Sequence, residues 1–133
     1  MKAPVWVDAS DALAIHAQLL VRHGGARGVL DKGLLESALA RRRQQFAYAS
    51  QDIIDMATAY AAGIVQNHPF VDGNKRTGFV VGVLFLELNG FDFTASEAET
   101  AQAVLELAAG TIDETGFALF LRDHVKRARK RMK

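Results

Sequence analysis

The nine residues His68–Arg76, with the sequence His-Pro-Phe-Val-Asp-Gly-Asn-Lys-Arg, gather many of the chemically reactive side chains of this chain. They combine an imidazole, a carboxylate, an amide, two cations and a glycine between two strongly apolar segments, Ile53–Val65 and Thr77–Leu88. Apolar segments on both sides of so polar a loop favour a site held on a rigid scaffold, where function often lies. The alternative is a connecting loop in which Asn74 only caps a helix, but a cap requires none of the charged groups beside it.

His68 is the residue of this loop best suited to acid–base chemistry. Pro69 disfavours a helical backbone at His68, so a helix is expected to end there and the imidazole to project from the rim of the core. An imidazole close to acidic and basic groups suits general-base catalysis near neutral pH, and Asp72 lies four residues further along the same loop. A histidine that only satisfies a polar position in the core is the alternative interpretation.

The second half of the loop has the residue types of a phosphate-binding site. Gly73, Asn74, Lys75 and Arg76 are predicted to open a helix, whose first backbone N–H groups are unpaired and attract anions. The glycine permits a close approach, and the two cations add positive charge for phosphate oxygens. Asp72, a single carboxylate beside such a site, suits Mg²⁺, which takes its other ligands from phosphates and water. The loop therefore predicts a nucleotide-phosphate site, although it lacks the spacing of a Walker loop.

The elements that hold this loop are expected to be helices, because apolar residues recur at helical spacing between capping and stop signals. The predicted helices run from Asp8 to Gly24-Gly25, from Asp31 to Arg41-Arg42-Arg43, over Ile53–Gln66, over about Lys75–Leu88, from Ser96 through Leu107, and from Thr111 to a region that includes Val125. Gln44–Ser50 is expected to form an irregular flap or a short extended piece, and Phe91–Phe93 a short extended segment. With no internal repeat or linker, residues 1–133 are expected to form a single compact all-α domain of about six helices.

The third and fourth predicted helices differ from the others. Both are apolar almost all round, which indicates the buried centre of a helical domain. Gly78 and Gly82, four residues apart, leave one face of the fourth helix without side chains, so that another helix can approach closely. The polar loop is therefore expected to connect the two central helices.

The composition excludes several classes of protein. The chain of 133 residues is half apolar and long enough for a hydrophobic core, and without cysteine it has neither disulfides nor thiolate metal sites. The apolar run at its start is too short for a signal peptide, and no run approaches the roughly 20 residues that cross a bilayer. We therefore expect a soluble, cytoplasmic protein without a membrane partner.

The basic tail Val125–Lys133 carries six cations and no acid, while the whole chain has a net charge of only +1. Such a tail can bind nucleic acid, but it is more often a helix end whose cations interact with the helix dipole. The rest of the chain is net acidic, and no helix-turn-helix with an exposed basic second helix is evident. A nucleic-acid partner is therefore not expected.

The motif His68-Pro-Phe-x-Asp72-Gly-Asn-x-Arg76 resembles the signature of the Fic/Doc family, whose members transfer part of a nucleotide to a hydroxyl group of a target protein. The segments Arg22–Gly25, Leu30-Asp31 and Leu86–Gly90 are similar to the small death-on-curing (Doc) branch. The resemblance spans most of the chain. It implies a small all-α bundle with the motif between the two central helices.

The resemblance also assigns roles to individual residues, with ATP as the nucleotide. It implies that His68 is the catalytic base and that Asp72 is the carboxylate linked to Mg²⁺. It assigns the phosphates to Gly73, Asn74 and Arg76, and Arg76 belongs to the catalytic set with His68 and Asp72.

Two positions depart from the adenylylating members of the family. Those members have glycine where this chain has Lys75, and a second arginine where it has Phe79. The change at Lys75 is typical of the Doc branch, whose best-known member is a kinase that phosphorylates a threonine of elongation factor Tu and so stops translation. The resemblance therefore favours a Ser/Thr kinase acting on a translation factor. Protein adenylyltransferase activity and a non-enzymatic nucleotide-binding module remain the alternatives.

Control of such an activity is expected to come from another protein. Many Fic proteins inhibit themselves with a helix that carries the pattern [S/T]-x-x-x-E-[G/N], and no segment of this chain matches it. The resemblance to the Doc branch implies a small antitoxin as the partner. Arg41-Arg42-Arg43 and the neighbouring flap could attract an acidic segment of that antitoxin.

Overall fold

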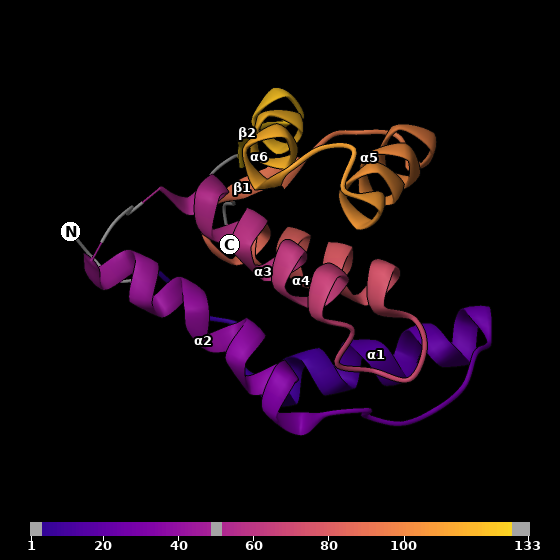
Figure 1. The fold of residues 1–133 in the computed structure, drawn as a ribbon. Coiled ribbons are helices and arrows are strands. Elements are labelled where there is room, and N and C mark those ends of the chain that lie inside the picture. Colours follow the sequence, from indigo (N-terminus) through magenta and orange to yellow (C-terminus); the bar gives the residue numbers. More distant parts are fainter. Residues whose placement is uncertain (1–3, 49–51, 129–133) are drawn as a thin grey trace, which may run out of the picture.

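The computed structural model describes residues 4–48 and 52–128, with residues 41–48 described by their backbone alone, and it confirms a compact all-α fold (Figure 1). The elements in chain order are α1 (Ala9–His23), α2 (Lys32–Tyr48), α3 (Ile53–Asn67), α4 (Asn74–Leu88), β1 (Phe91–Phe93), α5 (Glu97–Ala109), α6 (Glu114–Asp123) and β2 (Val125–Arg127). Among the described residues, no helix combines the length and the hydrophobicity needed to cross a membrane.

The two central helices of the fold are α3 and α4, as the sequence predicts. They lie side by side, with α1 and α2 against one side of the pair and α5 and α6 against the other (Figure 1). Every residue of α3 from Met56 to Val65 is buried, whereas α4 buries one broad face that includes Val81 and Phe85. The loop between α3 and α4 contains the polar motif and is therefore fixed at both ends by the core.

Gly78 and Gly82 allow α4 to lie directly against the backbone of α3. A Cβ atom at Gly78 would lie 2.8 Å from a methyl group of Val65 and 3.0 Å from the carbonyl oxygen of Ala61. A Cβ atom at Gly82 would lie 3.1 Å from the carbonyl oxygen of Ala57. These distances are too short for a Cβ atom to fit without displacing its neighbours, so the prediction of a close helix contact at the two glycines is confirmed.

The predicted helix starts are confirmed except for that of α6. α4 begins at Asn74, within one residue of its predicted start, and has no side-chain cap. In each of the other confirmed starts, a side chain accepts a hydrogen bond from a backbone N–H of the first turn: Asp8, Asp31, Asp52 and Ser96. The predicted cap at Thr111 is wrong, because the N–H of Thr111 still bonds to the carbonyl of Glu106 in the turn that ends α5. Asp113 is the cap instead, and its carboxylate accepts the N–H of Gly116 at 2.8 Å.

The expected irregular flap at Gln44–Ser50 is wrong as far as Tyr48, where α2 ends. The segment between Leu34 and Tyr48 contains neither glycine nor proline and is rich in Ala, Arg and Gln, which favour helices. Nothing in this segment therefore interrupts the helix. The last two residues of the predicted flap, Ala49 and Ser50, lie outside the described residues.

The start of the basic tail is a strand rather than the end of a helix, so the prediction that α6 extends through Val125 is wrong. Val125–Arg127 pairs antiparallel with Phe91–Phe93 to form a small two-stranded sheet. The carbonyl of His124 accepts both the backbone N–H and the hydroxyl of Thr94, at 2.7 and 2.8 Å, which draws the chain towards β1. Residues 129–133 of the predicted tail lie outside the described residues.

Two side chains fix the N-terminal segment to the central helices. The hydroxyl of Tyr60 in α3 accepts the N–H of Val7 at 2.7 Å and donates to the Val7 carbonyl at 2.9 Å. The side-chain amide of Asn89, at the end of α4, bonds in the same two-sided way to the backbone of Val5. These contacts hold the start of α1 against the core.

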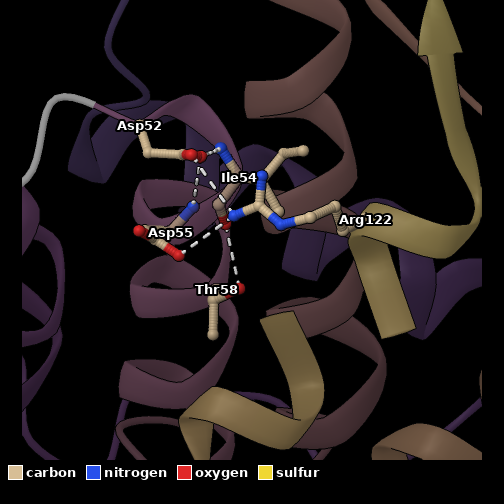
Figure 2. Close-up of polar contacts among 5 residues, drawn as sticks. All are labelled: Asp52, Ile54, Asp55, Thr58 and Arg122. Atoms are coloured by element: carbon tan, nitrogen blue, oxygen red, sulfur yellow. Dashed lines mark hydrogen bonds and ion pairs between the residues drawn. The ribbon is translucent and has the colours of Figure 1, made fainter. Parts of the chain in front are cut away.

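Arg122 connects α6 to the start of α3 (Figure 2). Its guanidinium lies 3.2 Å from the carboxylate of Asp52 and 3.5 Å from that of Asp55. The side chains are 45%, 38% and 44% exposed, respectively, so water screens both ion pairs. We therefore expect only a small contribution to stability from Arg122.

Candidate active site

The motif loop begins at His68, where α3 ends as predicted. His68 is the C-cap of α3 and has a left-handed backbone, with φ of 51° and ψ of 56°, while its N–H still bonds to the carbonyl of Ile64. It is the non-glycine residue with positive φ among the described residues, and such a conformation is strained for a residue with a Cβ atom. The turn directs the chain away from the helix, and the imidazole is exposed.

Asn74 closes the loop onto itself. Its side-chain oxygen accepts the N–H of Phe70 at 2.9 Å, and its side-chain nitrogen donates to the Phe70 carbonyl at 2.9 Å. Asn74 is 8% exposed and Phe70 is 1% exposed. The amide of Asn74 is therefore engaged within the loop, and its backbone N–H is the group at this position that can face an anion.

The start of α4 has the open backbone that an anion site requires. Gly73 is the N-cap and adopts a left-handed conformation, with φ of 80°. No side chain caps the first turn, so the N–H groups of Asn74, Lys75 and Arg76 are not used by a cap. The side chains of Lys75 and Arg76 are exposed on this turn. The helix dipole and two cations therefore make this end of α4 attractive to phosphate.

The carboxylate of Asp72 bridges the motif loop and the segment that joins α1 to α2. One oxygen accepts the N–H of Gly73 at 2.8 Å, and the other accepts the N–H of Ala26 at 3.2 Å. A Cβ atom at Gly25 would lie 2.9 Å from this second oxygen, and the φ of Gly25 is +118°, so glycine is needed there. Each carboxylate oxygen keeps a lone pair for a further ligand.

Backbone hydrogen bonds continue this contact between the two segments. The N–H of Val71 donates to the carbonyl of Gly28 at 3.0 Å, and the N–H of Leu30 donates to the carbonyl of Pro69 at 2.7 Å. The motif loop is thus paired with the α1–α2 segment as well as held by α3 and α4. This pairing could not be predicted, because the two segments are about forty residues apart in the sequence and neither has a strand pattern.

His16 is a contact of the motif loop that sequence reasoning missed. Its Nε2 atom lies 2.8 Å from the carbonyl oxygen of Asp72, and its ring stacks on Phe70. The sequence pattern of α1 draws attention to apolar residues such as Leu13 and Val21, yet these two are 38% and 82% exposed. The buried face contains Ala12 and His16 instead. Their spacing of four residues is the one sequence signal that could have indicated it.

A cleft of about 900 Å³ lies in front of the loop. All the predicted site residues line it: His68, Asp72, Gly73, Asn74, Lys75 and Arg76. Its other walls are largely apolar and include Phe79 of α4, Phe93 of β1 and Val104 of α5. A cleft with polar groups at one end and apolar walls at the other is the usual form of a site for a small molecule such as a nucleotide.

The residues present suit Mg²⁺ bound together with phosphates. Among the described residues, no group of three His, Asp or Glu side chains is arranged to hold a metal ion. A metal at Asp72 would therefore take most of its ligands from phosphate oxygens and water, which is how Mg²⁺ is commonly held beside nucleotides. The exposed carboxylate, with free lone pairs next to the open turn of α4, is compatible with that arrangement.

Comparison with known proteins agrees with this geometry. Residues 6–86, which include α1, α2, α3, the motif loop and most of α4, match the Fic/DOC family. The chain belongs to the Fic/Doc family. The family predicted from the motif is thus confirmed, and the matched residues contain both segments that hold Asp72.

Two Doc relatives are similar to this Fic/Doc protein over most of its length. The protein kinase doc of Escherichia phage P1 is 30% identical over 117 residues, which cover 87% of this chain and 92% of the relative. The toxin Doc of Mycolicibacterium smegmatis is 36% identical over 101 residues, which cover 71% of this chain and 75% of the relative.

Proposed function

We propose that this Fic/Doc protein is a toxin that transfers the γ-phosphoryl group of ATP to a serine or threonine hydroxyl of a target protein. The observation that carries the proposal is one cleft that brings together His68, Asp72 and the open first turn of α4. The names of the two relatives, a protein kinase and a toxin, support the same function.

His68 has the position of a general base in this proposal. Its imidazole is exposed on the cleft, and no described residue forms a hydrogen bond or ion pair with the ring. A target hydroxyl can therefore approach a ring nitrogen directly and give up its proton as its oxygen attacks the γ-phosphorus. The bond from the γ-phosphorus to the bridging oxygen breaks in the same reaction, and ADP leaves.

The first turn of α4 stabilises the negative charge of the phosphates. Backbone N–H groups with the side chains of Lys75 and Arg76 present fixed positive charge to their oxygens, which is the main contribution a protein makes to phosphoryl transfer. When Mg²⁺ is bound, Asp72 holds it beside the phosphates, where its charge offsets theirs.

Phe79 supports phosphoryl transfer over adenylyl transfer. Adenylylating relatives are expected to have an arginine at this position, one helical turn beyond Lys75. Here the Phe79 ring lines the cleft and packs edge-on against Phe93, with ring centroids 5.5 Å apart. An apolar wall cannot bind a γ-phosphate as an arginine does. The pose that directs the α-phosphate towards the target, which such an arginine would stabilise, is therefore disfavoured.

Partners follow from the toxin proposal. A small antitoxin would restrain the enzyme, since no self-inhibitory motif is present in the sequence. The side chains of Arg41, Arg42 and Arg43, which are expected to attract an acidic antitoxin segment, lie outside the described residues. Elongation factor Tu is the first target to test, because the resemblance to the Doc branch suggests a translation factor.

The proposal is tested by incubating the purified protein and ATP with a cell lysate and identifying modified peptides by mass spectrometry. We expect phosphoserine or phosphothreonine to increase on a single abundant protein, and the His68→Ala variant to leave that peptide unmodified. An adenylylated peptide would establish the alternative transferase activity. ATP binding without any modified peptide would favour the nucleotide-binding module.

A further inference from the structure

We propose that His16 is a positioning residue for this site: it holds the motif loop through the Asp72 carbonyl and so fixes the Asp72 carboxylate and the start of α4. Its effect on nucleotide binding rests on the proposed function, but its effect on the loop does not. His16 lies in α1, 56 residues from Asp72 in the sequence, and it is 5% exposed.

The contact with Asp72 is a hydrogen bond of defined direction. The Nε2 atom of His16 lies 2.8 Å from the carbonyl oxygen of Asp72. A carbonyl oxygen only accepts, so Nε2 must carry a proton and donate it. The bond fixes the backbone of Asp72 from α1, while the N–H groups of Ala26 and Gly73 fix the Asp72 carboxylate.

The His16 ring also contacts the residues on both sides of Asp72. It stacks on the ring of Phe70, with centroids 3.9 Å apart and an interplanar angle of 9°. On the other side, a Cβ atom at Gly73 would lie 3.7 Å from the Cδ2 and Nε2 atoms of the imidazole, which is ordinary van der Waals contact. One side chain therefore supports three points of the loop, the last of which is the N-cap of α4.

An apolar side chain of similar size could fill the space but could not donate the hydrogen bond. The Asp72 carbonyl would then lose its partner inside the protein, and the peptide plane would be free to rotate. Rotation of this plane would turn the N–H of Gly73, which shares the peptide bond, away from the Asp72 carboxylate that accepts it, and the carboxylate would lose a hydrogen bond that orients it. Groups that orient a metal ligand in this way typically affect metal affinity or activity about 10- to 100-fold when they are replaced.

The surroundings of α1 allow this idea to be tested without loss of the helix. The capping box of Asp8 and Asp11 starts α1, and Tyr60 holds the preceding residue Val7. Neither contact involves His16. His16→Leu removes the hydrogen bond and keeps much of the volume, whereas His16→Gln keeps an N–H donor of similar reach. His124 provides a matched control, because its Nδ1 also bonds to a backbone carbonyl, that of Phe120, at 2.8 Å and away from the cleft.

The first measurement is calorimetry with ATP and Mg²⁺ on the wild type and the three variants. We expect His16→Leu to weaken binding about 10- to 100-fold, His16→Gln to restore most of the affinity, and His124→Leu to bind like the wild type. Equal affinity of His16→Leu and the wild type would overturn the proposal, as would an equal loss in His16→Leu and His16→Gln.

The second measurement is independent of nucleotide and separates this proposal from the proposed function. In nuclear magnetic resonance spectra of the wild type, the Nε2 proton of His16 should be visible and protected from exchange with water. The N–H of Gly73 should exchange faster in His16→Leu but not in His16→Gln. A wild type that binds no ATP would refute the proposed function, while a protected Nε2 proton would still support the role of His16. An unprotected Nε2 proton in the wild type would overturn that role, even if His16→Leu did not fold.

Discussion

The side chain of Asn74 closes a ring with the backbone of Phe70, bonding to both its N–H and its carbonyl at 2.9 Å. The motif loop therefore has its shape before any nucleotide binds. The side-chain amide of an asparagine in such a motif could bind phosphate, but here the amide of Asn74 connects the end of the loop to Phe70 in its middle. We call this pair of hydrogen bonds the Asn74 tie.

Asn74→Ala should therefore destabilise the protein as well as the site. Both backbone groups of Phe70 lose a buried partner, which costs about 1–3 kcal/mol for each group left unpaired. Urea denaturation of the variant should show a lower midpoint than the wild type. Lys75→Ala, an exposed change at the next residue, should shift stability by no more than about 0.5 kcal/mol. Equal midpoints for the two variants would show that the Asn74 tie is not formed in solution.

His68→Ala should remove activity without affecting the fold. The imidazole is exposed and bonds to no other described residue, so its loss leaves no buried group unpaired. Loss of a general base is expected to slow transfer by about 10² to 10⁴. The variant should also relieve growth arrest when it is expressed without an antitoxin. Arrest as strong as that of the wild type would rule out His68 as the base.

Arg76→Ala and Arg122→Ala should separate binding from stability. Arg76 is exposed at the start of α4, so its loss should weaken binding of ATP with Mg²⁺ in calorimetry and leave the melting temperature nearly unchanged. Arg122 pairs with Asp52 and Asp55 far from the motif, so its loss should lower stability by about 0.2–1 kcal/mol and leave ATP binding intact (Figure 2). The reverse pattern would mean that Arg76 is a structural residue.

The pair of His124 and Glu99 predicts a dependence of stability on pH. The hydrogen bond from Nδ1 of His124 to the carbonyl of Phe120, and then its contact with Glu99 at 3.1 Å, raise the pKa of His124. Hydrogen bonds from the backbone and side chain of Ser96, and then His124, lower the pKa of Glu99. A protonated imidazole donates from both nitrogens, which is what the carbonyl and the carboxylate require.

The two shifts act at opposite ends of a pH window. A raised pKa in the folded protein adds stability below the unfolded pKa of His124, and this stability is lost as pH rises through the folded value. A lowered pKa adds stability above the unfolded pKa of Glu99, and it is lost as pH falls through the folded value. Melting temperature should therefore fall between about pH 6 and pH 8 in the wild type more than in His124→Phe. Identical profiles would show that the pair is not formed.

Local sequence signals were sufficient for the central part of the fold. Cap residues such as Asp8 and Ser96 act on N–H groups within three residues, and Gly78 with Gly82 marks a helix face directly. The motif loop could be placed between two buried helices for the same reason, since its neighbours are apolar on every side. These features depend on residues that are close in sequence, and the structure confirms them, although one local signal, the predicted cap at Thr111, was wrong.

Features that depend on distant residues could not be predicted. Val125–Arg127 becomes a strand only because β1 offers an edge more than thirty residues away. The support of Asp72 by Ala26 and His16 joins segments 46 and 56 residues apart, and no local pattern links them. The helical course of α2 beyond Arg43 was missed for a different reason, because the cluster of three arginines obscured a composition that favours a helix.

ATP labelled separately at the α- and γ-phosphorus tests the central claim most directly. Lys75 at the open turn of α4 and the apolar ring of Phe79 on the cleft wall favour a pose in which the γ-phosphate faces the target. We therefore predict that label reaches a target protein from the γ position only, and that His68→Ala abolishes this transfer. Label that reaches the target from the α position only would mean adenylyl transfer and would contradict the kinase assignment.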